Sequence, residues 1–194
     1  MTATAPLSTD ALIQACRAAV GAHVFGSHSQ CGDATVLVAR EGLLALAAQL
    51  RDDPALQFDM LIDVTAVDYS DYPPNLRAAV SPVDADHPAG LSSAGLPRFE
   101  VVYHFVSLPR GHRLRVKVPL ELDDLRLPTL CDLFGAANWG ERECFDMYGV
   151  QFDGHPDLRR ILTYDEFEGH PLRKDYPLRG YQPLTALPTL TDYA

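Results

Sequence analysis

The chain has 194 residues, 47% of them hydrophobic, and its 26 acidic and 16 basic residues give a formal net charge of −10. This composition excludes a disordered or fibrous protein, and the length suits one domain or one domain with a tail. The negative charge argues against nucleic acid or an anionic membrane surface as the main partner. Apolar runs such as 43–48 are far shorter than the roughly 20 residues of a membrane span. The N-terminal sequence shows no basic region followed by an apolar stretch, so we do not expect a secretory signal.

The cysteines Cys16, Cys31, Cys131 and Cys144 form no CxxC pair. Structural zinc and iron–sulfur sites usually draw on such local pairs. We therefore expect reduced and mostly buried thiols and no metal site. The alternative is a site assembled from distant segments.

The first 68 residues predict two helices and two strands. Ser8 or Thr9 can cap a helix that runs to about His23. The β-branched run 34–40 predicts a strand, and 41–52 predicts a helix, because Leu43, Leu46, Ala47 and Leu50 follow helical spacing. Residues 57–68 predict a well-buried strand with apolar residues on both faces.

Residues 69–98 hold five prolines and two glycines and show no periodicity. Such a segment predicts a long surface loop, which is unusual in a compact domain. We interpret it as a tolerated insertion rather than an active-site lid, because it holds few plausible catalytic groups.

The next segment predicts a β-hairpin, with strands at 99–108 and 112–120 around a turn at 109–111. In the second strand Arg113, Arg115 and Lys117 alternate with apolar residues and share one face. This basic stripe is either a docking face or the solvated side of a sheet, and we favour the solvated side.

Two short helices are predicted between the hairpin and residue 150. Thr129 with Asp132 resembles a capping box for a helix that ends near Gly135, and Asn138 with Glu141 resembles a second that ends at Gly149. The predicted fold is therefore α+β, with a mainly antiparallel sheet packed with helices, over residues 1–149.

Residues 150–194 contain five prolines, isolated aromatic residues and no persistent period. They hold too many apolar groups for a solvated tail. We therefore predict a long extended C-terminal tail that docks onto another protein.

Three sequence blocks carry a resemblance to a known family. They are ERECFDMYG at 141–149, GHPDLRRIL at 154–162 and GHPLRKDYPL at 169–178. Together they closely resemble the signature of the 30-kilodalton subunit family of respiratory complex I, the NADH-quinone oxidoreductase. The segments 63–69 and 99–104 resemble its strand motifs.

The residues of these blocks are typical of an interface rather than of a catalytic pocket. Each Gly-His-Pro forms a compact corner, and the basic pair after each corner can bind carboxylates on a neighbour or on this domain. These groups lie along a line instead of converging. The candidate partner interface comprises Glu141, Arg142, Glu143, Asp146, Gly149, His155, Pro156, Asp157, Arg159, Arg160, His170, Pro171, Arg173, Lys174 and Asp175.

Within this set, we expect the basic residues after the corners to anchor the tail through ion pairs. Glu141, Arg142, Glu143 and Asp146 would order the junction between domain and tail. The anchoring residues are Arg159, Arg160, Arg173 and Lys174.

Two chemical alternatives remain open for the same residues. His155, Asp157, His170 and Asp175 could ligate a metal ion. His155 with Glu143 or Asp146 could form an acid–base pair. No GxGxxG motif follows a strand, so no recognisable motif binds NADH or FMN.

The resemblance implies a subunit of a proton-translocating NADH:quinone oxidoreductase. It implies no cofactor in this chain, with FMN, iron–sulfur clusters and quinone held by partner subunits, and no chemistry by this chain alone. The tail would wrap the 49-kilodalton subunit in the peripheral arm on the cytoplasmic side of the cell inner membrane. The alternatives are an equivalent subunit of a membrane-bound hydrogenase or other quinone-linked dehydrogenase, and a stand-alone acidic binding module.

Overall fold

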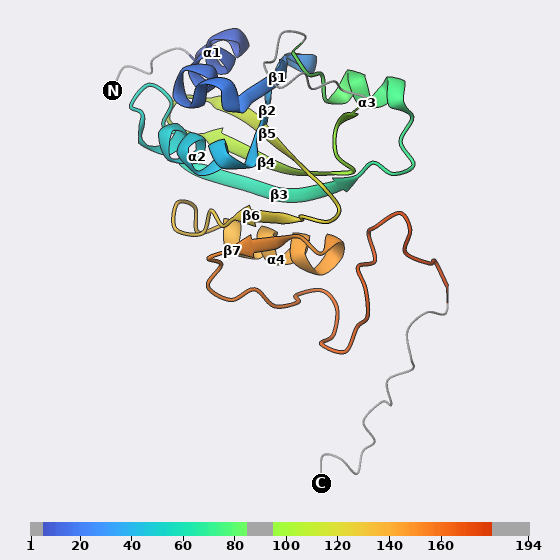
Figure 1. Cartoon of the computed structure of the whole chain (residues 1–194). Helices are drawn as coiled ribbons and strands as arrows, with labels where there is room; N and C mark the ends of the chain where they lie inside the picture. Colours follow the sequence, from blue (N-terminus) through green and yellow to red (C-terminus); the bar gives the residue numbers. More distant parts are fainter. Residues whose placement is uncertain (1–5, 85–94, 180–194) are drawn as a thin grey trace.

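The fold is taken from a computed structural model, which describes residues 6–84 and 95–179 (Figure 1). Its helices are α1 (Thr9–Val20), α2 (Leu43–Asp52), α3 (Pro74–Val80) and α4 (Ala137–Tyr148). Its strands are β1 (Val24–His28), β2 (Ala34–Val38), β3 (Met60–Asp68), β4 (Phe99–Ser107), β5 (His112–Leu120), β6 (Arg126–Pro128) and β7 (Gln151–Asp153). Within these ranges, no helix is long and apolar enough to cross a membrane.

The centre of the fold is a five-stranded sheet with the order β1-β2-β5-β4-β3. Neighbouring strands are antiparallel except for β2 and β5, which are parallel. The parallel pair needs a long crossover, and the chain makes it through α2, β3 and β4 before returning as β5. This sheet with its helices confirms the predicted α+β class.

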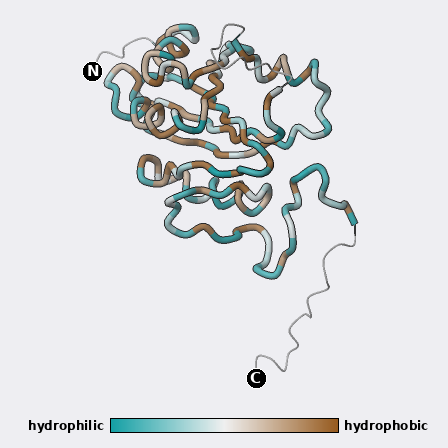
Figure 2. The backbone as a smooth tube through the Cα atoms, viewed as in Figure 1, coloured by the Kyte–Doolittle hydropathy of each residue, from teal (hydrophilic) through white to brown (hydrophobic). Residues whose placement is uncertain are grey.

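The main core lies on one face of this sheet. Tyr103, Phe105 and Val116 belong to it, in one cluster with the apolar residues of α1, α2 and α4. Figure 2 shows the apolar stretches concentrated in these strands and helices, whereas the tail alternates between polar and apolar residues. Each fully buried Leu or Phe contributes about 1.5–3 kcal/mol of transfer free energy.

The N-terminal elements follow the predicted order, with two differences. Ser8 caps α1 by accepting a hydrogen bond from the Ala11 N–H, but Gly21, with a φ of 55°, ends the helix before His23. The short strand β1, which sequence reasoning missed, pairs with β2.

The expectation that β3 is buried on both faces is wrong. Ile62 is 53% exposed and Met60 is 46% exposed. A register shift between Leu61 and Asp63 interrupts the pairing with β4. Such a bulge reorients the side chains of an edge strand, which has no neighbour on its outer side.

The prediction of a simple surface loop at 69–98 is also wrong for the part of it that the structure describes. The segment contains α3, which begins with Pro74 at its first turn, where proline is tolerated. Around α3 lies a buried polar cluster centred on Glu100, which is fully buried. The Glu100 carboxylate accepts hydrogen bonds from Tyr69 Oη (3.0 Å), Ser81 Oγ (3.0 Å) and Arg77 (3.3 Å). Residues 85–94 of the predicted loop lie outside the described residues.

This cluster also changes the interpretation of the basic stripe. The Lys117 side chain is buried. Its ammonium group donates to Val80 O and Ser81 Oγ and lies 3.7 Å from Glu100 Oε2. Arg113 is exposed and Arg115 is partly buried. The stripe is therefore covered by the α3 region at one end only.

We predict that the polar cluster around Glu100 holds the α3 segment on the sheet. Arg77→Met should lower the free energy of unfolding by about 2–4 kcal/mol, because it leaves the buried Glu100 carboxylate short of a charged partner. Arg51→Met removes an exposed ion pair with Asp52 and should leave the free energy of unfolding nearly unchanged, since water screens such pairs. Urea unfolding of the purified variants measures both effects, and equal losses would contradict the prediction.

Candidate partner-binding site

The three family-like blocks meet around α4, which packs closely on β3. Gly140 permits this approach, because a Cβ at this position would lie 2.9 Å from Val64 Cβ. One turn later, the Cys144 thiol lies 3.5 Å from Val64 O. The helix ends at Gly149, which has the left-handed conformation with a φ of 81°. The predicted end of this helix is confirmed.

The Asp146 carboxylate, which is fully buried on α4, binds the chain where it returns along the helix. It accepts hydrogen bonds from the backbone N–H groups of Ile161 (3.0 Å), Leu162 (2.8 Å) and Thr163 (2.9 Å). Arg160 adds an ion pair at 2.7 Å. Burial alone raises the pKa of Asp146, but the hydrogen bonds from Thr163, Leu162 and Arg160 outweigh it and hold this pKa well below its usual range.

The second Gly-His-Pro corner covers the C-terminal end of α4. Arg173 Nε donates to Tyr148 O at 2.6 Å, and the Leu172 N–H donates to Met147 O at 3.2 Å. His170 Nδ1 lies 3.0 Å from Asp146 O. These contacts satisfy carbonyl groups that a helix end leaves without partners, and the guanidinium complements the negative end of the helix dipole. Gly149 is favoured here, since its φ of 81° strains other residues and a Cβ would lie 2.6 Å from His170 Nε2.

The first Gly-His-Pro corner lies near the beginning of α4. His155 Nε2 lies 3.2 Å from Asn138 O, and the Asp157 N–H donates to His155 Nδ1 at 3.0 Å. Arg142 donates to the backbone oxygens of Arg159 and Arg160, both at 3.2 Å. The two corners thus hold opposite ends of one helix.

A further attachment joins the tail to the main sheet. The Lys174 N–H donates to Asp68 Oδ2 at 2.9 Å, and Arg98 binds both Asp68 (2.6 Å) and Asp175 (2.9 Å). Burial tends to raise the pKa of Asp68, but the bonds from Arg98, Lys174 and Ser70 lower it well below its usual range. The described part of the tail, residues 150–179, is therefore bound to its own domain through Asp146, both corners, Asp68 and the pairing of β7 with β6. We call this segment the proximal tail.

The fifteen predicted interface residues divide by exposure. Glu141, Asp146 and Gly149 are buried within this chain, and their place in a partner interface stays a prediction. The partly buried ones are Arg142, His155, Arg160, His170, Pro171 and Arg173, and the exposed ones are Glu143, Pro156, Asp157, Arg159, Lys174 and Asp175. Arg160 and Arg173 use their guanidinium groups within this chain, which was one of the two possibilities for the basic pairs. A partner role for the exposed residues stays a prediction.

Glu141 does not complete a capping box, because its carboxylate points into the fold. It accepts from the Leu130 N–H (2.7 Å) and from Thr129 Oγ1 (2.5 Å). The helix predicted between Thr129 and Gly135 is absent, and the chain forms turns there that Glu141 holds against α4. Burial raises the pKa of Glu141, whereas the two hydrogen bonds lower it in part.

The histidine and aspartate residues considered as metal ligands are held at different places. His155 lies near the start of α4 and His170 near its end, and twelve residues of helix separate these ends by about 18 Å. In the described ranges, the group of possible ligands that does come together is Cys131, Glu141 and His155, with ligand atoms within 4.8 Å of one another.

The hydrogen bonds of this group disfavour a metal ion. The Asp157 N–H donates to His155 Nδ1, which places the imidazole proton on Nε2 and leaves no free lone pair. Glu141 already accepts three hydrogen bonds, including one from the Cys131 thiol at 3.6 Å. The proposed acid–base pair of His155 with Glu143 or Asp146 is not formed, because the ring nitrogens contact backbone groups instead.

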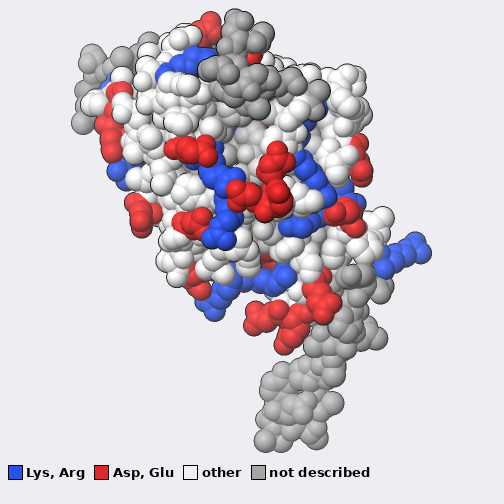
Figure 3. Space-filling view, viewed as in Figure 1, with Lys and Arg blue, Asp and Glu red and all other residues white. Residues whose placement is uncertain are grey.

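Sequence reasoning missed the apolar part of the same surface. Five large apolar side chains of α4 and the proximal tail are exposed, namely Trp139, Leu162, Tyr164, Leu172 and Leu178. An excess of apolar residues in the tail was the signal, but it did not show which of them face solvent. On the face of the molecule seen in Figure 3, acidic and basic side chains are interspersed.

Residues 36–182 match the family described as the respiratory-chain NADH dehydrogenase, 30 Kd subunit. The chain belongs to this family. Its relatives include an NADH-quinone oxidoreductase subunit of Acidithiobacillus ferrooxidans, which is 46% identical over 83% of this chain and 71% of that protein. The subunit of the same name from Burkholderia multivorans is 44% identical over 84% of this chain and 74% of that protein.

Two solved structures resemble the fold. A trypsin-resistant fragment (1-134) of Nqo5 is 33% identical, with a TM-score of 0.57 over 77% of this chain and 98% of that chain. A chain of the membrane-bound sulfane sulfur reductase, an archaeal respiratory membrane complex, has a TM-score of 0.63 over 87% of this chain and 85% of that chain. At 20% sequence identity, this likeness concerns the fold alone. The 30-kilodalton family thus shares its architecture with a chain of a different respiratory assembly.

We predict that the Asp146 carboxylate controls release of the proximal tail. Asp146→Asn should lower the opening free energy by about 2–3 kcal/mol, because three N–H donors and Arg160 lose their charged acceptor. Trypsin should then cleave after Arg160 about 30–150 times faster, if opening is rapid compared with cleavage. Asp157→Asn, which breaks only an exposed pair with Arg159, is the control. Equal cleavage rates in the two variants would contradict the prediction.

The lowered pKa values of Asp68 and Asp146 also predict how the tail responds to acid. A carboxyl group with a lowered pKa stabilises the folded form above its unfolded pKa of about 3.9 and loses this effect as the pH falls further. The proximal tail should therefore stay attached at pH 5 and detach only below about pH 4. Fluorescence of Trp139, the single tryptophan, reports this release, and a midpoint near pH 6 would show that other groups hold the tail.

Proposed function

We propose that this chain is a cofactor-free subunit in the peripheral arm of a proton-translocating NADH:quinone oxidoreductase. In this proposal it binds the 49-kilodalton-type subunit through α4 and the tail. The redox chemistry, with FMN, iron–sulfur clusters and quinone, belongs to partner subunits. The assembly would hold the chain on the cytoplasmic side of the cell inner membrane. Membership of the 30-kilodalton family supports the place of this chain in such a complex. The exposed apolar side chains of the tail support the binding mode.

The observation that carries the binding mode is the exposure of large apolar side chains on α4 and on the tail segment that Arg142 holds. Trp139 is 64% exposed and Leu162 is 63% exposed. The Arg142 guanidinium lies 5.4 Å from the centre of the Trp139 ring and donates to the backbone oxygen of Arg160, two residues before Leu162. Exposed Trp and Arg are typical of the residues that dominate binding energy at protein interfaces.

The anchoring of the proximal tail supports the same interpretation. Beyond β7 the described tail has no helix or strand. Such a segment, if unattached, would lose conformational freedom on binding, at about 1–2 kcal/mol per ordered backbone residue. The attachments through Asp146, Arg173 and Asp68 order the segment before any partner arrives. Preorganisation of this kind leaves more of the contact energy for affinity.

The internal bonding of the polar side chains supports a role without catalysis by this chain. The carboxylate of Asp146 and the rings of His155 and His170 are bound to backbone groups. Burial raises the pKa of Cys144 well above its usual value, so this thiol is not an activated nucleophile. These groups stabilise the attachment of the tail instead of meeting around a space for substrate.

A second candidate function is the equivalent role in another membrane-bound respiratory complex, such as a hydrogenase. The likeness in fold to a chain of the archaeal sulfane sulfur reductase favours it. Co-purification discriminates between the two candidates. NADH- and FMN-binding subunits should accompany the chain in an NADH:quinone oxidoreductase and should be absent from the alternative. A stand-alone binding module would instead purify alone.

Substitutions on the surface around Trp139 test partner binding without disturbing the fold of this chain. The double variant Trp139→Ser, Leu162→Ser should keep its thermal midpoint, since both side chains are already exposed. It should bind the 49-kilodalton-type subunit at least about 30-fold more weakly, because anchor residues at an interface each contribute about 2 kcal/mol. Membrane NADH:quinone activity should fall with the loss of assembled complex.

The matched control is Leu108→Ser in the β4–β5 turn, where Leu108 is 67% exposed. This variant should assemble and support activity like the unchanged chain. Co-purification from detergent-solubilised membranes through a tag on the 49-kilodalton-type subunit measures incorporation. Normal incorporation of the double variant would overturn the proposed binding mode.

A further inference from the structure

The face of the main sheet opposite α1 and α2 carries a feature that the contacts around α4 do not use. Here the register brings one residue from each strand into a single row. His28 of β1 pairs with Thr35, Thr35 with Arg115, Arg115 with His104, and His104 with Asp63 of β3. Arg115 donates to Thr35 Oγ1 at 3.1 Å, which fixes the guanidinium on the sheet.

The chain covers only one end of this face. A Cβ on Gly26 would lie 2.1 Å from Pro82 O, so the segment after α3 passes directly over β1. Leu37 beneath it is fully buried. The surface over β5, β4 and β3 remains open, as the 53% exposure of Ile62 shows.

A hollow of about 390 Å³ occupies this open surface. Its floor includes Thr65 and Val102, and its sides include Tyr72, His104, Arg115 and Lys117. Although the protein has 26 acidic residues, none of the residues that line this hollow is acidic. The volume lies within the range of about 300–1,000 Å³ that is usual for binding sites.

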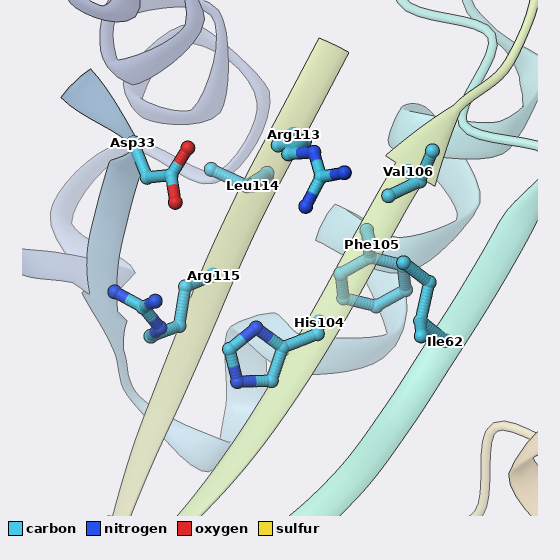
Figure 4. Close-up of a pocket in the computed structure, with 8 residues that line it drawn as sticks. All are labelled: Asp33, Ile62, His104, Phe105, Val106, Arg113, Leu114 and Arg115. Carbon is cyan, nitrogen blue, oxygen red and sulfur yellow. The ribbon is translucent and has the colours of Figure 1, made fainter. Parts of the chain in front are cut away.

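The hollow continues along the strands into a smaller depression of about 40 Å³, which shares His104 and Arg115 with it. Figure 4 shows the side chains of Arg113, Arg115 and His104 with Ile62 and Val106 around this depression, and Asp33 at one side. We call the two hollows together the trough. It extends from Tyr72 in the larger hollow to Ile62 in the smaller one. The lining of the trough combines basic groups and apolar side chains with one carboxylate, that of Asp33.

We propose that this trough binds an acidic segment of a neighbouring subunit in the same complex. This inference rests on the proposed function and adds a second contact surface to the one on the tail. Charge complementarity points to the occupant, because Arg113 and Arg115 present two guanidinium groups in a trough with one acidic lining residue, Asp33, on a molecule of net charge −10. Arg is enriched at interfaces, where its planar group binds carboxylates in bidentate fashion.

The shape of the trough favours a polypeptide segment. It runs over three strands instead of enclosing a ligand, and exposed Ile62 and partly exposed Tyr72 offer apolar contacts beside the charges. A segment that alternates Asp or Glu with apolar residues would match both kinds of group. The trough thus forms the docking-face alternative for the basic stripe, restricted to Arg113 and Arg115.

The test places a photo-crosslinking amino acid at Ile62 in the full chain, within the complex purified through a tag on another subunit. We expect cross-links to one protein segment in which acidic residues outnumber basic ones. The charge-altered chain Arg113→Glu, Arg115→Gln should reduce the cross-link yield at least about fivefold, as should an ionic strength of about 0.5 M. Arg51→Glu on α2, on the other side of the sheet, should leave the yield unchanged.

Each other outcome overturns the inference. These outcomes are cross-links to lipid, to a segment without acidic excess or to this chain alone, no cross-links, and a yield that is insensitive to the Arg113 and Arg115 changes. Arg113→Glu alone, at an exposed position, serves if the double variant fails to fold. If the complex contains this chain but Ile62 forms no cross-link, the trough proposal fails and the proposed function stands. If the unchanged chain is missing from the complex, the proposed function itself fails.

Discussion

The arrangement of the family-like region depends on the buried carboxylate of Asp146. It gathers three successive backbone N–H groups and the Arg160 guanidinium at one point on α4. A carboxylate with this many donors is more stable ionised than protonated, even though burial opposes its charge. Because one side chain satisfies three backbone groups, residues 161–163 hold a defined position without forming a helix or strand.

The second consequence concerns the end of α4. A helix end leaves carbonyl groups without partners, and here the returning chain supplies the donors through Leu172 and Arg173. Gly149 makes the close approach possible. The helix and the proximal tail therefore complete each other, so a change in one is expected to disturb the other. This mutual dependence is a physical reason for the blocks at 141–149, 154–162 and 169–178 to occur together in one sequence.

The same principle organises the other side of the sheet. Glu100 is buried beneath α3 and is satisfied by Tyr69, Arg77 and Ser81, which all come from the segment between β3 and β4. This segment thereby covers Lys117 and leaves Arg113 and Arg115 accessible. The fold thus presents two separate surfaces, one around Trp139 and one in the trough. A subunit of a multisubunit complex has use for both.

The sequence by itself determined the α+β class, the hairpin of β4 and β5, the capped start of α1 and the glycine end of α4. These features depend on local periodicity, turn residues and caps, which short stretches of sequence contain. It also identified the family, because three ordered blocks are specific even where their geometry is unknown. Tertiary structure alone decided that Glu141 and Asp146 point inward, that residues 74–80 form a helix over a buried cluster and that Ile62 is exposed. Each of these outcomes depends on a contact between residues far apart in the chain, such as Asp146 with Leu162 or Arg77 with Glu100, and no local pattern encodes such a contact.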